Sequence, residues 1–207
     1  LQALTALDRP MAREKLAITV LAFGLASGSV AALLRTSWAD VAASAVIGLM
    51  IGLLSVASAS RPRLHEASDA IAALLATLTA TAIAAFITPL SLQTVVIASL
   101  IVLMPGLMLT TAVAELSSQN WASGTARFAG ATVALLKLTF GTIVATQAAH
   151  AMGWQPQLIS APQLPAWAEW GGLLVGSAAF AVLFGAARRD FLVVMAGAWI
   201  GYGLTRL

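Results

Sequence analysis

Residues 95–116, VVIASLIVLMPGLMLTTAVAEL, are apolar enough to cross a membrane, yet Pro105 and Gly106 interrupt the stretch near its middle. As a helix, the part before the break would span about 15 Å, half of a bilayer core. Proline removes a backbone donor and glycine adds conformational freedom, so we expect one helix to end here and another to begin at Gly106. Free N–H groups of the second half-helix would then lie near the bilayer midplane, as in transporters whose substrate sites use broken helices. The alternative is a proline kink without a site, because membrane helices tolerate proline.

The composition of the whole chain is that of a membrane protein. Of its 207 residues, 60% are hydrophobic and only 9% are charged, and the mean hydropathy is +0.93. Soluble domains carry about 25% charged residues. Cysteine is absent, which excludes disulfides and thiolate sites, and no metal-ligand spacing or nucleotide fingerprint occurs. We therefore expect no cofactor and no enzymatic activity. The first residue is a leucine with no signal-peptide pattern after it, so we expect the numbering to start inside a longer protein.

Hydrophobic runs predict an all-α, polytopic membrane bundle of about seven transmembrane helices, the fourth of them broken at Pro105-Gly106. Residues 1–15 are expected to form a cytosolic juxtamembrane segment, and residues 16–150 a first unit of five helices. Residues 151–170 are expected to form an extracytoplasmic loop, and residues 171–207 the first hairpin of a second, inverted unit. The expected spans are residues 16–34, 41–59, 70–87, 95–116, 124–149, 171–187 and 191–204.

Acidic and hydroxyl residues ahead of apolar runs mark the expected helix starts. Asp40 and Asp190 each precede a span and are predicted N-caps. Residues 60–69 are expected to be a polar loop in which Ser68 or Asp69 caps the third span.

The Lys and Arg residues predict the orientation of the chain. Eight of the 11 fall in segments that would face one side of the membrane, two face the other, and one lies within a span. Because cytoplasmic loops carry the excess of positive charge, the N-terminus is predicted to lie in the cytosol of a bacterial inner membrane.

A partial inverted repeat relates the first predicted hairpin to the last. GxxxG pairs recur at offsets of 148–149 residues, at Gly24/Gly28 and Gly48/Gly52, then at Gly172/Gly176 and Gly197/Gly201. Such pairs alone mark only close helix packing. An odd number of spans separates the copies, so the second hairpin would point the opposite way, as in many secondary transporters.

Three polar residues after the break are candidate site residues. Thr110 and Thr111 would contact a polar ligand, or else bond back to their own helix carbonyls. Glu115, at the end of the span, is either a carboxylate that carries a coupling proton or a solvated interfacial acid.

Two cations share the fifth predicted span. Arg127 is expected to mark the cytosolic interface, and Lys137, ten residues further on, would lie about 15 Å deeper, level with Pro105. A buried ammonium group is rare, so Lys137 is predicted to be functional or to form a structural ion pair. His150, at the other end of this span, is predicted to be an interfacial histidine.

Three segments of the chain resemble the threonine/serine exporter family: PGLMLTTAVAEL (105–116), SGTARF (123–128) and RTSWAD (35–40). The family pattern is a proline-glycine, a threonine, an acid, a glycine and an arginine, here Pro105, Gly106, Thr110, Glu115, Gly124 and Arg127. Aspartate is more usual than glutamate at the acid, and Ser117-Ser118-Gln119 stands where a glycine is usual. The C-terminal segment FAVLFGAARRDFLVVMAGAWIGYGLTRL (180–207) resembles the opening of the family's second membrane unit.

The resemblance implies a secondary transporter that exports small hydroxylated amino acids, driven by protons. Pro105, Gly106, Thr110 and Thr111 would then bind the substrate. Glu115, Lys137 and Arg127 would be candidates for coupling or for the site. The expected partners are a small amino acid, protons, the lipid bilayer, and a further copy or a second membrane subunit, with no nucleic acid. The alternative is a non-transporting membrane subunit that scaffolds or completes a partner transporter chain.

Overall fold

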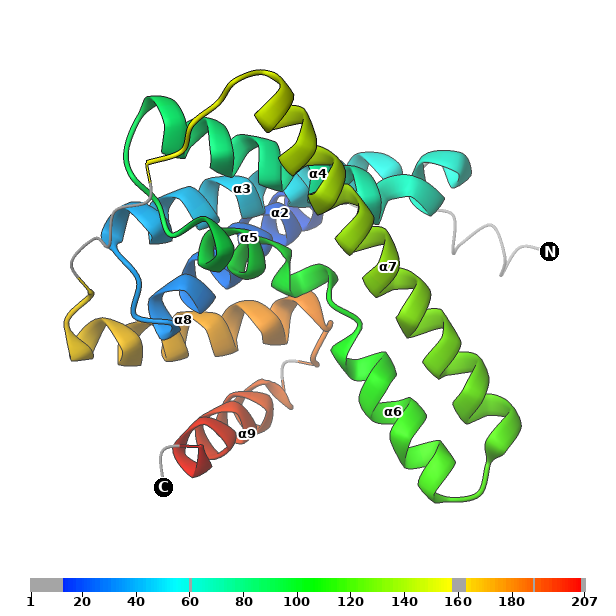
Figure 1. Cartoon of the computed structure of the whole chain (residues 1–207). Coiled ribbons are helices and arrows are strands. Elements are labelled where there is room, and N and C mark those ends of the chain that lie inside the picture. Colours follow the sequence, from blue (N-terminus) through cyan, green and yellow to red (C-terminus); the bar gives the residue numbers. More distant parts are fainter. Residues whose placement is uncertain (1–12, 60, 158–162, 188, 206–207) are drawn as a thin grey trace.

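The computed structural model describes residues 13–59, 61–157, 163–187 and 189–205, and within these residues the chain forms helices and no strands (Figure 1). The all-α prediction is therefore confirmed. The juxtamembrane segment predicted for residues 1–15 lies almost wholly outside the described residues. The helices are α2 (Arg13–Leu33), α3 (Trp38–Ser58), α4 (Pro62–Phe86), α5 (Leu92–Leu100), the 3₁₀-helix η1 (Ile101–Leu103), α6 (Gly106–Ser117), α7 (Trp121–Ala151), α8 (Ala166–Leu183) and α9 (Phe191–Leu204).

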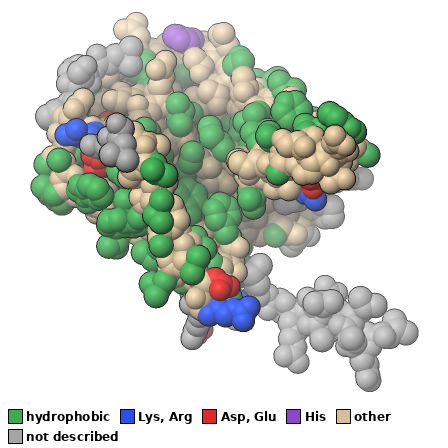
Figure 2. Space-filling model, turned by 90° about the horizontal axis from the view of Figure 1, so that it is seen from below, with side chains coloured by type: hydrophobic (Ala, Val, Ile, Leu, Met, Phe, Trp, Pro, Cys, Tyr) green, Lys and Arg blue, Asp and Glu red, His purple; other side chains and the backbone are tan. Residues whose placement is uncertain are grey.

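Among the described helices, α2, α3, α4, α7 and α8 are each long and apolar enough to cross a membrane. The pair formed by residues 92–103 and α6, bent by 62°, supplies a sixth crossing if the two parts count as one span. With 14 residues, α9 is about 21 Å long, shorter than a hydrocarbon core. Hydrophobic side chains spread over much of the face seen in Figure 2, and charged side chains occur there only in small groups. The chain is thus a multi-pass membrane protein, and about seven helices is consistent with the structure.

Helix α2 packs between α3 and α8, and glycines bring these backbones close together. A methyl group built on Gly48 of α3 would lie 2.8 Å from the carbonyl oxygen of Phe23 in α2. One built on Gly172 of α8 would lie 3.0 Å from the Cβ of Ala32 in α2. Small residues in membrane helices allow such close approach, and van der Waals contact then replaces the hydrophobic effect as the driving force.

The second hairpin begins antiparallel to the first, as an inverted repeat requires. Glu169, near the start of α8, pairs with Arg35, which follows α2, whereas Gly176, further along α8, packs against Ser29 within α2. The two helices therefore run in opposite directions. The glycine pairs are used differently, however. Gly24 and Gly28 face α3 within their own hairpin, whereas Gly172 and Gly176 face α2. Because Gly197 and Gly201 of α9 have open space beside them, the repeat itself stays a prediction.

Helix α4 presents a buried row of alanines, and α7 lies parallel to it. The row consists of Ala72, Ala73, Ala76, Ala80 and Ala84. Gly141 of α7 sits directly against the carbonyl oxygen of Ala70, and its built methyl would lie 2.9 Å from the Cβ of Ala73. Only the second half of α7 follows α4. The first half diverges from the bundle and packs against α6, and these two segments form what we call the arm (Figure 1).

Two predicted helix starts are wrong. Helix α4 begins at Pro62 and not at residue 70, so residues 62–69 belong to the helix, and neither Ser68 nor Asp69 is its cap. Arg61 occupies the cap position. The reason is that proline fits the first helical position, where its missing N–H costs no hydrogen bond. Polar residues in this first part of the helix resemble a loop in sequence. Likewise, α8 begins at Ala166 and not at residue 171, so residues 166–170 belong to this helix and not to the predicted loop.

One of the two predicted N-caps, Asp40, is also corrected. Ser37, not Asp40, caps α3, and the two residues form a capping box. The Ser37 hydroxyl accepts the Asp40 N–H at 3.1 Å, and the Asp40 carboxylate accepts the Ser37 N–H at 3.0 Å. The other oxygen of buried Asp40 accepts the N–H of Ser91 at 2.9 Å, which ties α3 to the start of α5. Asp190 does occupy the cap position of α9, but its side chain makes no capping hydrogen bond.

Candidate functional site

The predicted break at Pro105 is present, and the chain geometry explains it. The residue before a proline is pushed out of the helical region, and Met104 accordingly adopts an extended conformation at φ −66° and ψ 130°. Pro105 then turns the chain with φ −79° and ψ 46°, and the Gly106 N–H donates to the Met104 carbonyl at 2.8 Å. This tight three-residue turn reorients the backbone, and α6 starts at Gly106.

The first turn of α6 carries the free backbone donors that a broken helix predicts. No side chain caps this helix. Its first N–H, that of Gly106, is used by the turn, and the N–H of Leu109 donates to the Pro105 carbonyl at 2.9 Å. The N–H groups of Leu107 and Met108 find no acceptor anywhere in the described part of the chain. A methyl built on Gly106 would meet nothing within 4 Å, so space is open beside this turn.

The hydroxyls of Thr110 and Thr111 bond back to their own helix. Thr110 donates to the Leu107 carbonyl at 2.9 Å, and Thr111 donates to the same carbonyl at 2.7 Å. Their protons are therefore committed, while the oxygen lone pairs stay available to a ligand donor. Back-bonding to the helix is therefore present, and contact of the same oxygens with a polar ligand is compatible with it.

Glu115 and Arg127 form an ion pair inside the arm. The Arg127 Nε donates to the Glu115 Oε1 at 2.9 Å, across the tip of the hairpin between α6 and α7. Gly124 permits this closeness, because a methyl there would lie 2.8 Å from the Leu116 Cγ. The second carboxylate oxygen of Glu115 is buried and has no hydrogen-bond partner in the described part of the chain. The structure thus brings together the acid, the glycine and the arginine of the sequence pattern.

Lys137 lies elsewhere, on the second half of α7. Its Nζ donates to the backbone carbonyl of Glu66, in the second turn of α4, at 2.8 Å. The unknown partner of this lysine is thus a peptide carbonyl and not an acid side chain. A carbonyl has no signature in the sequence, which is why the partner could not be named from it.

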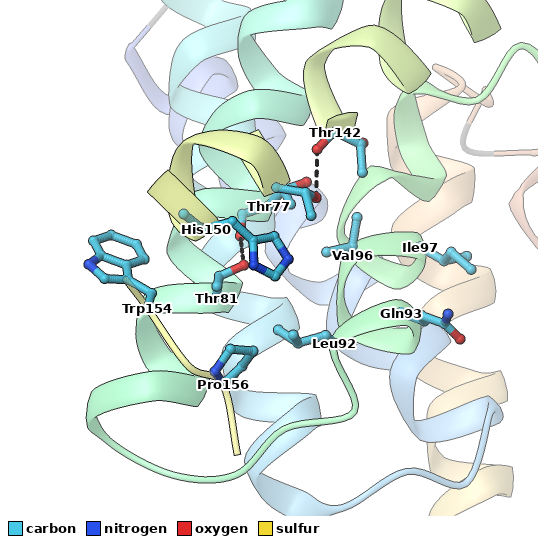
Figure 3. A pocket seen from close by; sticks show the side chains of 12 residues that line it. Thr77, Thr81, Leu92, Gln93, Val96, Ile97, Thr142, His150, Trp154 and Pro156 are labelled. Carbon is cyan, nitrogen blue, oxygen red and sulfur yellow. Dashed lines mark hydrogen bonds between the residues drawn. The ribbon is translucent and has the colours of Figure 1, made fainter. Parts of the chain in front are cut away.

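A pocket of about 520 Å³, which was not predicted from the sequence, lies between α4, α5 and the end of α7. Figure 3 shows threonines of α4 and α7 around one space, with Leu92 and Val96 of α5 beside them. The lining residues are Thr77, Thr81, Leu92, Gln93, Val96, Ile97, Thr142, Thr146, Ala149, His150, Trp154 and Pro156.

A signal for this pocket is present in the sequence, in the spacing of its polar residues. Thr77 and Thr81 are four residues apart, and so are Thr142, Thr146 and His150. Residues four apart share one helix face. The two faces meet only because α4 and α7 pack in parallel with this register, and that register is not readable from either helix alone.

Comparison with known proteins gives one family. The model of the family ThrE, described as "Putative threonine/serine exporter", matches residues 1–149. No curated protein and no solved structure matches the chain.

Proposed function

The chain belongs to the threonine/serine exporter family, and from this membership we propose that it exports threonine, serine or a similar small hydroxylated amino acid. The observation that carries the proposal is the helix restart at Gly106, where open space lies beside the glycine and the N–H groups of Leu107 and Met108 have no acceptor among the described residues. A helix N-terminus attracts a carboxylate through these donors and through its dipole. The lone pairs of Thr110 and Thr111, one turn further on, would accept from the ammonium or hydroxyl group of the substrate.

Proton coupling is assigned in this proposal to Glu115, with Arg127 as its partner. The Glu115 carboxylate has one oxygen on Arg127 and one buried oxygen without a partner. A proton on the second oxygen would neutralise the carboxylate and weaken the attraction of the arginine. Lys137 would have a positioning role, because its bond to Glu66 holds α7 against α4.

The test is efflux of labelled threonine from loaded cells that express the full chain. Pro105→Ala restores a backbone donor and lets the preceding helix run on, so we expect efflux to fall at least about tenfold at equal expression. Gly171→Ala is the control, since a methyl there meets nothing within 4 Å. Efflux should also fall when the proton gradient is collapsed. Wild-type efflux from the Pro105→Ala variant would refute the proposed site.

The second candidate is a membrane subunit that completes a partner transporter chain. It is favoured by the arm, whose apolar side chains Leu107, Trp121 and Val113 are 70%, 64% and 56% exposed. Purified chain in lipid vesicles separates the two functions. Threonine flux from this chain alone supports the exporter, whereas flux only after a second membrane chain is added supports the subunit.

A further inference from the structure

The pocket between α4, α5 and α7 contains an unsatisfied polar group. Thr77 is 4% exposed, its hydroxyl oxygen is buried, and among the described residues this hydroxyl has no hydrogen-bond partner. A buried hydroxyl is almost always paired in a folded protein, because leaving it unpaired costs its hydration. Thr77 therefore indicates that something polar completes this pocket.

The remaining threonines define what that polar group can be. Thr81 donates to the Thr77 carbonyl at 2.7 Å, and Thr146 donates to the Thr142 carbonyl at 2.9 Å. Thr142 donates in turn to the Leu138 carbonyl at 3.0 Å. With their protons committed, these three hydroxyls can only accept. The α4 and α7 side of the pocket thus offers acceptors to a hydrogen-bond donor.

Three helix ends lie close to the pocket residues. Helix α7 ends at Ala151, next to pocket residues Ala149 and His150, and α4 ends at Phe86, little more than a turn beyond Thr81. Helix C-termini carry partial negative charge. Helix α5 starts at Leu92, after the five residues that follow α4; its cap makes no side-chain hydrogen bond, and the donor-bearing Gln93 lines the pocket. An N-terminus carries partial positive charge.

We propose that this pocket is a second binding site for a zwitterionic amino acid of the size of threonine. The ammonium group would contact the Thr77, Thr81 and Thr146 oxygens of α4 and α7, and the carboxylate would face Gln93 and the start of α5. The identity of the ligand rests on the proposed export function. The site lies on the same broken span as the helix restart, since Ile97 precedes Pro105 by eight residues.

The absence of cysteine allows a direct test on the full chain in lipid vesicles. Ile97→Cys places a thiol at the pocket, and Ile143→Cys, on α7 and outside the lining, is the matched control. We expect L-threonine to slow maleimide labelling at position 97 and not at position 143. Two probes that each lack one charge, 1-aminopropan-2-ol without the carboxylate and 3-hydroxybutanoate without the ammonium, should each protect at least about tenfold less well. That factor corresponds to one lost charge-assisted hydrogen bond.

A second variant tests the anchor. In the Ile97→Cys background, Thr77→Val removes the hydroxyl at nearly constant volume and should raise the half-protecting threonine concentration about tenfold, whereas Thr77→Ser should not. Protection by threonine in a chain that shows no export would uphold the site and refute the exporter. Absence of protection in a chain that does export threonine would overturn the site and leave the exporter standing. Equal protection by all three probes would also overturn it, since the pocket would then not distinguish charge.

Discussion

Asp40 stabilises the bundle through two backbone donors that otherwise have no partner. Its carboxylate is fully buried and accepts from Ser37 and Ser91, so one side chain joins the start of α3 to the start of α5. Hydrogen bonds to a charged group contribute about 1.5–3 kcal/mol each, and an unpaired buried donor is costly. We expect Asp40→Ala to lower the free energy of unfolding by about 3 kcal/mol, measured by thermal denaturation in detergent.

Asp190→Ala is the matched control for this variant. Asp190 makes no capping bond, and its side chain is 56% exposed with Arg189 3.6 Å away. Exposed ion pairs contribute at most about 1 kcal/mol. An equal loss of stability in both variants would show that burial of Asp40 does not matter.

Substitution of Glu115 can show whether the Glu115–Arg127 pair contributes to stability or to transport. Because the Arg127 side chain is 51% exposed, the pair should add no more than about 1 kcal/mol to folding. If Glu115 carries the coupling proton, Glu115→Gln should reduce threonine efflux at least about tenfold with a nearly unchanged melting temperature. Ser117→Ala, also near the tip of the arm, should leave efflux unchanged. Full efflux from Glu115→Gln at wild-type rate would exclude this carboxylate from coupling.

At the scale of the elements, α4 and α7 depend on Gly141. A methyl group there would be pushed against the Ala70 carbonyl oxygen, which is backbone and cannot rotate away, and against Ala73. Overpacking of this kind costs about 1–3 kcal/mol. We therefore expect Gly141→Ala to lower the melting temperature, while Gly171→Ala, with open space around it, should not lower it. An unchanged melting temperature for Gly141→Ala would mean that the two helices do not pack this closely.

The positions of the membrane helices and of the break could be predicted because each depends on local chemistry. Hydropathy marks the apolar spans, and the effect of Pro105 on Met104 is confined to adjacent residues. The start of α4 could not be predicted, because its first turns are polar and extend beyond the apolar part of the helix. The pocket and the partner of Lys137 could not be predicted either, because both depend on the packing register between α4 and α7.

At the scale of the whole molecule, the predicted orientation makes opposite ends of α7 face opposite compartments. Ser118 precedes α7 on the predicted cytosolic side, and Met152 follows it on the other. In intact cells, a membrane-impermeant maleimide should label Met152→Cys and should reach Ser118→Cys only after permeabilisation. The wild-type chain, which has no cysteine, gives the background. The reverse labelling pattern would show that the chain has the opposite orientation in the membrane, and that the distribution of Lys and Arg does not predict its topology.

The docking of α8 onto α2 has a mechanical consequence. Leu164 donates to the Thr36 carbonyl at 3.1 Å just ahead of α8, and the glycines of α8 interlock with Ala32 and Ser29 along α2. Sliding would force these side chains over one another, so the two helices move as one body. Helix α6, by contrast, has α7 as its main neighbour and joins the bundle through the 62° bend. Because α7 runs unbroken from α6 to its close contact with α4 at Gly141, any swing of α6 about Pro105 would also have to bend or displace α7.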